Sequence, residues 1–257
     1  MQTFNYHTHT YRCKHANGTD EEYVLNAISI GLKTLGFSDH CPYPGYSMHD
    51  RMDYEELNDY LESLNSLKEK YKDQIDIKIG LECEYFEQFH DYYKFLSENL
   101  DYLVLGQHYS AIDGIDYWDK CTDEDIKSYT NAVVKGLKTG FFKYFAHPDY
   151  VLISRDTYND TLNKAFEKIF ETCKENDIIV EINLKGKRLG KKEINGKEQY
   201  IYPFRDVFKL VSKYNCKCAY GQDTHNPLFF KEFYKDIDEV NEILKGIDLN
   251  IVEDIDI

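Results

Sequence analysis

The sequence has few residues that break secondary structure and no long apolar run. It contains five prolines and 14 glycines among 257 residues, and no stretch rich in proline, glycine or serine divides it. No apolar run approaches the roughly 20 residues that a transmembrane helix needs. The N-terminus leads directly into a strand-like segment and lacks the pattern of a signal peptide. We therefore expect one domain over residues 1–257, a cytoplasmic location and no membrane partner.

Positive charge is also scarce, with 31 Lys and Arg against 46 Asp and Glu, so the formal net charge is −15. Such a chain is a poor partner for the phosphate backbone of a nucleic acid, and we expect none. The seven cysteines are an odd count that favours reduced thiols. Cys13, Cys41 and Cys83 adjoin candidate ligands, and we interpret them as buried bystanders. Composition leaves the oligomeric state open.

Short apolar runs alternate with longer amphipathic stretches along the chain. The runs typical of strands cover residues 3–9, 34–38, 75–82, 102–107, 141–147, 178–183 and 217–222. Helices are expected near 20–31, 54–72, 87–98, 123–138, 157–175, 204–214 and 229–244. Thr19 is expected to cap the first helix, with Glu22 as its capping-box partner.

Seven strand-then-helix units predict an α/β fold with parallel strands and helical crossovers. That number favours a closed or nearly closed barrel over an open sheet. The remaining segments, 41–51, 113–120 and 185–202, are expected to be irregular. Because they follow the second, fourth and sixth strands, a barrel would place all three at one rim.

Seven of the nine histidines fall at or just past the ends of the predicted strands. In a parallel barrel these ends form the rim that carries catalytic groups. With two carboxylates, the candidate metal ligands are His7, His9, His15, His40, Glu82, His108, His147, Asp223 and His225. His7 and His9 are two residues apart on one strand, so their rings point to the same side.

This set of donors predicts a centre of two to three divalent ions. Imidazole and carboxylate ligands suit Zn, Mn or Fe. Nine donors exceed the three or four that one tetrahedral zinc takes from a protein. A centre with several ions can activate water and hold a phosphoryl group between the ions.

Other residues near the motifs allow more than one interpretation. Asp39 is interpreted as a carboxylate that orients a ligand histidine, although a ligand or a helix cap is an alternative. Asp149 is similarly ambiguous, and His15 taken alone could be a surface loop residue. His49 in a polar loop and His90 in a helix are interpreted as non-ligands.

Taken in order, the motifs resemble those of the polymerase and histidinol phosphatase (PHP) superfamily. They are His7-Thr8-His9, His15, Ser38-Asp39-His40, Gly80-Leu81-Glu82, Gly106-Gln107-His108, Ala146-His147-Pro148-Asp149 and Gly221-Gln222-Asp223-Thr224-His225. The resemblance spans residues 6–225. It implies a distorted (β/α)7 TIM-like barrel with a trinuclear metal centre at the C-terminal rim of the strands.

The resemblance also divides the ligands among three ions. His7, His9, Glu82 and Asp223 would hold the first ion. The second would be held by Glu82, His108 and His147, with Glu82 bridging, and the third by His15, His40 and His225. Asp223, His225 and Glu82 are the expected catalytic residues.

Residues 181–188 and the later pair Tyr202-Pro203 resemble a stretch of monofunctional histidinol-phosphate phosphatases. This resemblance implies that Arg188 binds the substrate phosphate, for which a planar guanidinium is suited. A solvated basic loop is the alternative, since Lys185, Lys187, Lys191 and Lys192 surround Arg188. Gln107, Gln222 and Thr224 replace smaller residues frequent in the superfamily, so the pocket wall is expected to differ.

The predicted reaction is metal-dependent hydrolysis of a small phosphate monoester, with L-histidinol phosphate as the expected substrate in histidine biosynthesis. Asp223, His225 or a metal-bound water could protonate the leaving alcohol, and the sequence does not choose between them. A phosphotyrosine protein or a sugar phosphate is the alternative substrate. A nuclease-like phosphodiesterase and an inactive metal-binding protein are the more distant alternatives.

Overall fold

The protein is described by a computed structural model over residues 1–255, so the last two residues of the predicted 1–257 domain lie outside the described part. Its main sheet has eight strands in the order β1-β2-β3-β4-β5-β6-β9-β10. They are β1 (Phe4–Asn5), β2 (Thr34–His40), β3 (Asp76–Cys83), β4 (Tyr102–Leu105), β5 (Tyr144–Phe145), β6 (Ile179–Asn183), β9 (Lys217–Gly221) and β10 (Asn250–Ile251). All neighbouring strands pair in parallel.

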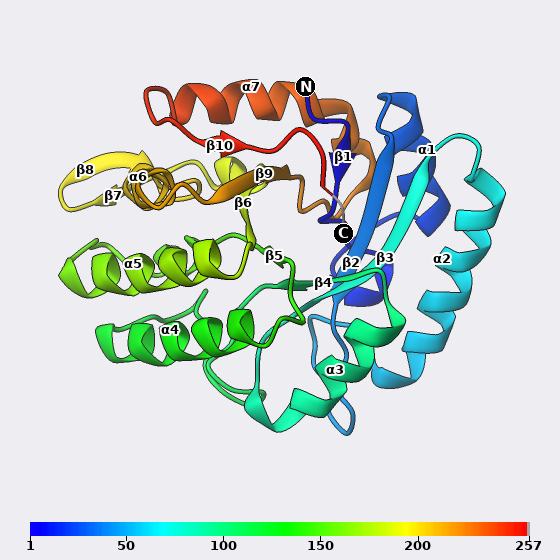
Figure 1. Cartoon of the computed structure of the whole chain (residues 1–257), viewed down its shortest axis with the longest axis horizontal. Coiled ribbons are helices and arrows are strands. Elements are labelled where there is room, and N and C mark those ends of the chain that lie inside the picture. Colours follow the sequence, from blue (N-terminus) through cyan, green and yellow to red (C-terminus); the bar gives the residue numbers. More distant parts are fainter. Residues whose placement is uncertain (256–257) are drawn as a thin grey trace.

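The helices of residues 1–255 lie around the outside of the curved sheet (Figure 1). They are α1 (Asp20–Ser29), α2 (Leu57–Tyr71), α3 (His90–Asn99), α4 (Asp123–Lys138), α5 (Asp160–Glu175), α6 (Arg205–Lys213) and α7 (Phe233–Ile243). Short 3-10 turns occupy Tyr11–Cys13, Tyr54–Glu56, Glu87–Phe89, Tyr150–Leu152, Gly186–Leu189 and Pro227–Glu232. Within residues 1–255, no helix is both long enough and apolar enough to cross a bilayer.

This architecture confirms the predicted distorted (β/α)7 barrel. The seven expected strands and helices are all present in order, and Thr19 and Glu22 form the expected capping box. α3 and α7 begin later than expected, at His90 and Phe233, because a 3-10 turn precedes each of them. The stripe of leucines in α2 faces the core, with Leu57, Leu64 and Leu67 buried.

The two ends of the sheet meet at the rim where the strands point their C-terminal ends. β1 and β10 are the edge strands, yet Thr8 and Thr224 form a parallel bridge just beyond β1 and β9. The backbone N–H of His9 donates to the carbonyl of Thr224 at 3.0 Å. The barrel is therefore closed at the rim, at the level of the candidate ligands.

A cluster of large side chains fills the inner face of the sheet below this rim. Tyr6, Tyr102 and Tyr144 are buried there together with Phe4 and Val104. The hydroxyl of Tyr102 donates to the backbone carbonyls of Tyr6 at 2.8 Å and Phe37 at 3.0 Å. Because buried polar groups need such partners, this tyrosine ties the neighbouring strands together from inside.

The prediction that residues 185–202 are irregular was wrong. They contain an antiparallel hairpin of β7 (Lys191–Ile194) and β8 (Lys197–Tyr200). The turn is Asn195-Gly196, with φ angles of 52° and 73°, which suits a two-residue hairpin turn. β10 was also not predicted, because a two-residue strand carries too little pattern to be recognised.

Candidate metal centre

The candidate ligands come from separate parts of the sequence and converge at the closed rim. His40 ends β2 and Glu82 lies near the end of β3, while the others follow β1, β4, β5 and β9. A cavity of about 410 Å³ opens here, lined by His15, His40, Glu82, His108, His147, Asp223 and His225. His7 and His9 are fully buried and within 3.8 Å of the lining carboxylates Glu82 and Asp223.

Glu82 is at the centre of the cluster and is 1% exposed. Its Oε1 lies 2.7 Å from His147 Nε2 and 3.6 Å from His108 Nε2. Its Oε2 lies 3.1 Å from His40 Nδ1, and His7 and His9 are within 3.6 Å. Burial by itself would raise the pKa of Glu82, but His108, His7 and His147 outweigh it and hold this pKa well below its usual range.

Two glycines make room for the buried carboxylates of the site. A Cβ atom on Gly106 would lie 2.0 Å from Oε1 of Glu82. A Cβ atom on Gly221 would lie 1.8 Å from Oε1 of Glu181. Neither overlap is tolerable, so only glycine permits the close approach at these two positions.

Glu181 on β6 contacts a candidate ligand, although the sequence analysis assigned it no role. Its Oε1 lies 2.6 Å from His7 Nδ1, and both side chains are fully buried. Its Oε2 accepts from the backbone N–H of His147 and from Asn183 Nδ2, both at 2.9 Å. A carboxylate on one ring nitrogen fixes the tautomer and presents the other nitrogen to an ion. A glutamate inside a buried strand was the available signal in the sequence.

Glu84 was also assigned no role in the sequence analysis, and its carboxylate contacts His108. Its Oε1 lies 2.8 Å from His108 Nδ1, and its carboxylate is paired with the buried Arg51 at 2.7 Å. Burial opposes ionisation of Glu84, but Arg51 and His108 outweigh it and lower its pKa. Glu84 lies two residues beyond Glu82, which places both on one side of the chain if the strand pattern continues.

Asp39 lies between two ligand candidates. Its Oδ1 accepts from the backbone N–H of His40 at 2.8 Å and is 3.5 Å from His9 Nδ1. Its Oδ2 accepts from the backbone N–H of Thr10 at 3.2 Å. Asp39 is thus within reach of His9, while its role in orienting a ligand stays a prediction.

Lys185, the second residue after β6, occupies the side of the cluster formed by Asp223 and His225. Its Nζ lies 3.2 Å from Asp223 Oδ1 and 3.2 Å from His225 Nδ1. His15 is exposed at this side, and its ring stacks on that of His225 with centroids 4.6 Å apart. Burial opposes ionisation of Asp223, but Lys185 and His7 hold its pKa well below the usual range.

The candidate ligand atoms fit divalent cations in two ways: they lie close together, and some of them have no hydrogen-bond partner. Three-residue groups with donor atoms within 4.8 Å of one another are His7, His9, Glu82; His40, Glu82, His108; His7, His147, Asp223; and His15, His40, His225. Among the described residues, Nε2 of His225 and Oε2 of Glu82 are buried without a hydrogen bond. Nitrogen and oxygen donors left open in this way are what a metal ion completes.

These groups only partly follow the division implied by the resemblance. His15, His40 and His225 form the same group in both, and His7, His9 and Glu82 form a group that contains three of the four residues expected at the first ion. Asp223 is grouped with His7 and His147, and Glu82 with His108 and His40. Cys13, interpreted as a bystander, is also close enough to His9 and His225 to form a group with them.

Arg188 is paired with Asp236 and does not line the cavity. Its Nη2 lies 2.5 Å from Asp236 Oδ2 on α7, and its guanidinium lies 4.3 Å from the ring centroid of Phe229. Arg188 is not among the residues that line the cavity, whereas Lys185 and Leu189 from the same segment are. The phosphate-binding role of Arg188 stays a prediction, and it would require the guanidinium to leave Asp236.

The rest of the cavity wall is acidic and aromatic. Asp50, Asp116, Trp118, Tyr150 and Tyr202 line it, and His49, interpreted as a non-ligand, also faces it. Asp116 Oδ1 accepts from the Trp118 backbone N–H at 2.8 Å and from the Tyr150 hydroxyl at 3.2 Å. Burial raises the pKa of Asp116.

Comparison with known proteins gives one family and several relatives. The family model described as PHP domain matches residues 5–185. A probable histidinol-phosphatase of Deinococcus radiodurans is 25% identical over 234 residues, which are 86% of this chain and 85% of that protein. A histidinol-phosphatase of Bacillus subtilis is 30% identical over 125 residues, or 44% of this chain and 46% of that protein.

A solved structure shares the fold. It is a histidinol phosphate phosphatase from Lactococcus lactis complexed with zinc, L-histidinol and phosphate. The TM-score is 0.72 at 20% identity, covering 98% of this chain and 95% of that chain. The likeness therefore extends over nearly the whole fold.

Proposed function

Because the chain belongs to the PHP domain family, we propose that it is a metal-dependent phosphatase that hydrolyses L-histidinol phosphate to L-histidinol and phosphate. The observation that carries this proposal is the set of five imidazoles around the buried Glu82 at the floor of a cavity. The names of the relatives support the substrate. The reaction would serve histidine biosynthesis in the cytoplasm.

We further propose that two to three ions of Zn, Mn or Fe occupy the centre. The nine residues predicted as ligands would hold them, with Glu82 shared between two ions. When bound, such ions lower the pKa of water and stabilise charge on phosphoryl oxygens. Glu181 and Glu84 would keep the Nε2 atoms of His7 and His108 available, because each carboxylate contacts Nδ1 of its histidine.

The leaving alcohol must receive a proton, and Asp223, His225 or a water held at the centre is its proposed donor. Because the pKa of Asp223 is held low, this carboxylate would pass on a proton that it takes up during the reaction. Asp223 and His225 both line the cavity beside Lys185, which would place them near a bound ester. Glu82 is 1% exposed, so its proposed contribution is to the arrangement of the centre.

The cavity also supports the choice of substrate. At about 410 Å³ it suits a small molecule and is too small for a folded protein. Asp50 and Asp116 offer carboxylates to the ammonium group of an amino alcohol, and Trp118 offers an aromatic face to its imidazole. Trp118 and Tyr150 would also suit a phosphotyrosine side chain, so phosphotyrosine peptides are the second candidate substrate.

A substrate panel with a matched variant tests the proposal. The zinc- or manganese-loaded protein should release phosphate from L-histidinol phosphate faster than from sugar phosphates, phosphotyrosine peptides or a phosphodiester, and a chelator should stop the reaction. Turnover that persists after chelation would overturn the metal-dependent mechanism, and absence of turnover on every ester would favour an inactive metal-binding protein.

Asp116→Asn tests the acidic wall separately. It should raise KM for L-histidinol phosphate and leave KM for p-nitrophenyl phosphate, which has no ammonium group, within about twofold. Asp119→Asn is the matched control because Asp119 is exposed and outside the cavity lining. Equal effects of Asp116→Asn on both esters would contradict recognition of the ammonium group.

A further inference from the structure

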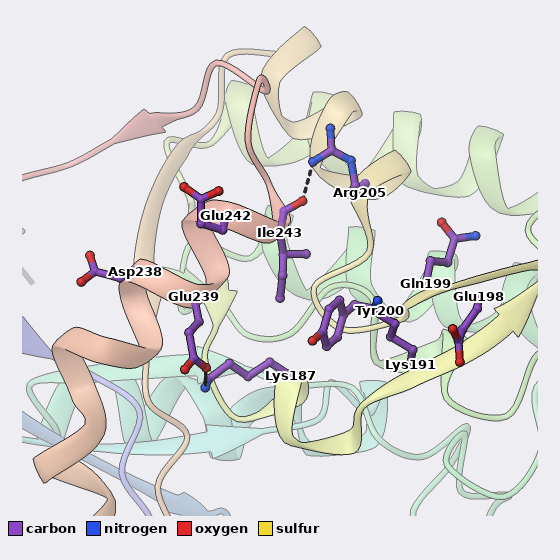
Figure 2. A pocket seen from close by; sticks show the side chains of 10 residues that line it. All are labelled: Lys187, Lys191, Glu198, Gln199, Tyr200, Arg205, Asp238, Glu239, Glu242 and Ile243. Atoms are coloured by element: carbon purple, nitrogen blue, oxygen red, sulfur yellow. Dashed lines mark hydrogen bonds and ion pairs between the residues drawn. The ribbon is translucent and has the colours of Figure 1, made fainter.

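Basic residues of the segment after β6 line two different cavities. Lys187 and Lys191 line a second cavity, between the β7–β8 hairpin and α7, that is distinct from the metal centre (Figure 2). Lys187 is held there by Asp236 at 2.8 Å and by Glu239. Lys185 alone among the lysines and arginines of the described residues lines the cavity of the metal centre.

The position of Arg188 is set by a buried carboxylate. Asp236 is 2% exposed and accepts from Gln222 Nε2 at 3.1 Å in addition to its pairs with Arg188 and Lys187. Removing one partner from such a buried network leaves a carboxylate with fewer bonds, which opposes movement of Arg188 into the cavity. A phosphate in the cavity would therefore contact a basic side chain other than Arg188.

Lys185 has both the position and the freedom to be that cation. Its backbone N–H donates to Asn183 Oδ1 at 2.9 Å, so the base of the side chain is fixed at the end of β6. Its side chain is 41% exposed, and its Nζ is 3.2 Å from Asp223 Oδ1. A bound divalent ion would share the charge of Asp223, which weakens that ion pair and frees the ammonium group.

We propose that Lys185 binds the phosphoryl group of the substrate. When the centre lacks metal and substrate, Asp223 and His225 hold the ammonium group of Lys185. The inference rests on the proposed phosphatase function, because it concerns the same cavity. A lysine ammonium suits this role as a point charge on a flexible stem that can move from a carboxylate to a phosphate oxygen.

Inorganic phosphate is the probe, because it is the product of any phosphate monoester and its binding requires no turnover. Isothermal titration calorimetry of the zinc-loaded protein should show that Lys185→Met weakens phosphate binding at least about tenfold, as expected for loss of a charge-assisted contact. Lys185→Arg should restore most of the affinity. Lys191→Met removes the same charge from the same segment and should leave phosphate affinity within about twofold.

Metal binding provides an independent readout. Lys185→Met should tighten zinc binding, because the ammonium group no longer competes for Asp223; this is measured by competition with a chelator. Weaker zinc binding would overturn the inference and make Lys185 a support for the ligands. Unchanged phosphate binding in Lys185→Met, together with weakened binding in Arg188→Ala, would also overturn it.

The experiments distinguish failure of the proposed function from failure of the inference about Lys185. If L-histidinol phosphate is not hydrolysed but phosphate binding still depends on Lys185, the substrate is wrong and the inference holds. If the zinc-loaded wild-type protein binds no phosphate, the inference is overturned.

Discussion

The contact between Glu181 and His7 gives a sharp test of how the metal centre is organised. In Glu181→Gln one carboxylate oxygen becomes an NH2 group. In the wild type, Oε1 of Glu181 is hydrogen-bonded to His7 Nδ1. Oε2 accepts from the backbone N–H of His147 and from Asn183 Nδ2. If the amide oxygen serves those two donors, its NH2 group faces His7 Nδ1. His7 must then move its proton to Nε2, the nitrogen that would otherwise bind an ion.

The expected cost follows from the loss of one well-oriented ligand. Mutations of residues that orient metal ligands typically reduce metal affinity by about 10- to 100-fold. This corresponds to roughly 1.4–2.8 kcal/mol of binding free energy. Because the contact is short, at 2.6 Å, and both side chains are fully buried, we expect a result toward the upper end.

The assay is a competition between the protein and a chromogenic chelator for zinc, with metal content per chain measured after dialysis. Glu171→Gln is the matched control, because Glu171 is an exposed residue of α5. Thermal unfolding of both variants checks that the fold is retained. Zinc affinity of Glu181→Gln within about twofold of the wild-type value would refute the assignment of Glu181 as the residue that orients His7.

Three further outcomes are expected. Gly106→Ala should lower metal content and phosphatase activity together, because the new methyl group would lie 2.0 Å from Glu82 Oε1; full metal content would contradict this. Arg51→Met should destabilise the protein by about 3–5 kcal/mol in urea unfolding, because Glu84 loses a buried partner; addition of Glu84→Gln should recover part of this loss. The seven cysteines are buried and burial raises the pKa of Cys216 to about 11, so the native protein should resist alkylation, as measured by mass spectrometry.

The order of elements and the positions of the ligand candidates could be predicted because both depend on local pattern. Apolar runs ended at histidines and carboxylates, and parallel strands bring those ends to one rim. The hairpin at 191–200 was missed because its strands are largely polar, although Asn195-Gly196 was a usable turn signal. The two residues of β10 carried no signal of comparable strength.

The contacts that orient the ligands could not be predicted from spacing. Glu181 is 174 residues from His7 in the sequence, and only the curvature of the sheet brings them together. The direction of Arg188 depends on Asp236, which belongs to a helix packed from outside. Motifs identify residue types at the rim, but the partners of those residues depend on tertiary packing.

Closure of the barrel through Thr8 and Thr224 has a consequence for the order in which the protein matures. His7 and His9 leave the ribosome early, but Asp223 and His225 follow more than 200 residues later. A growing chain can therefore expose several histidines long before it can assemble the complete centre. If the proposed ligands hold the ions, insertion of the last ion would follow synthesis of the final ligand. Metal loading would then report on completion of the fold, and a chain truncated before residue 223 would not acquire the complete set of ions.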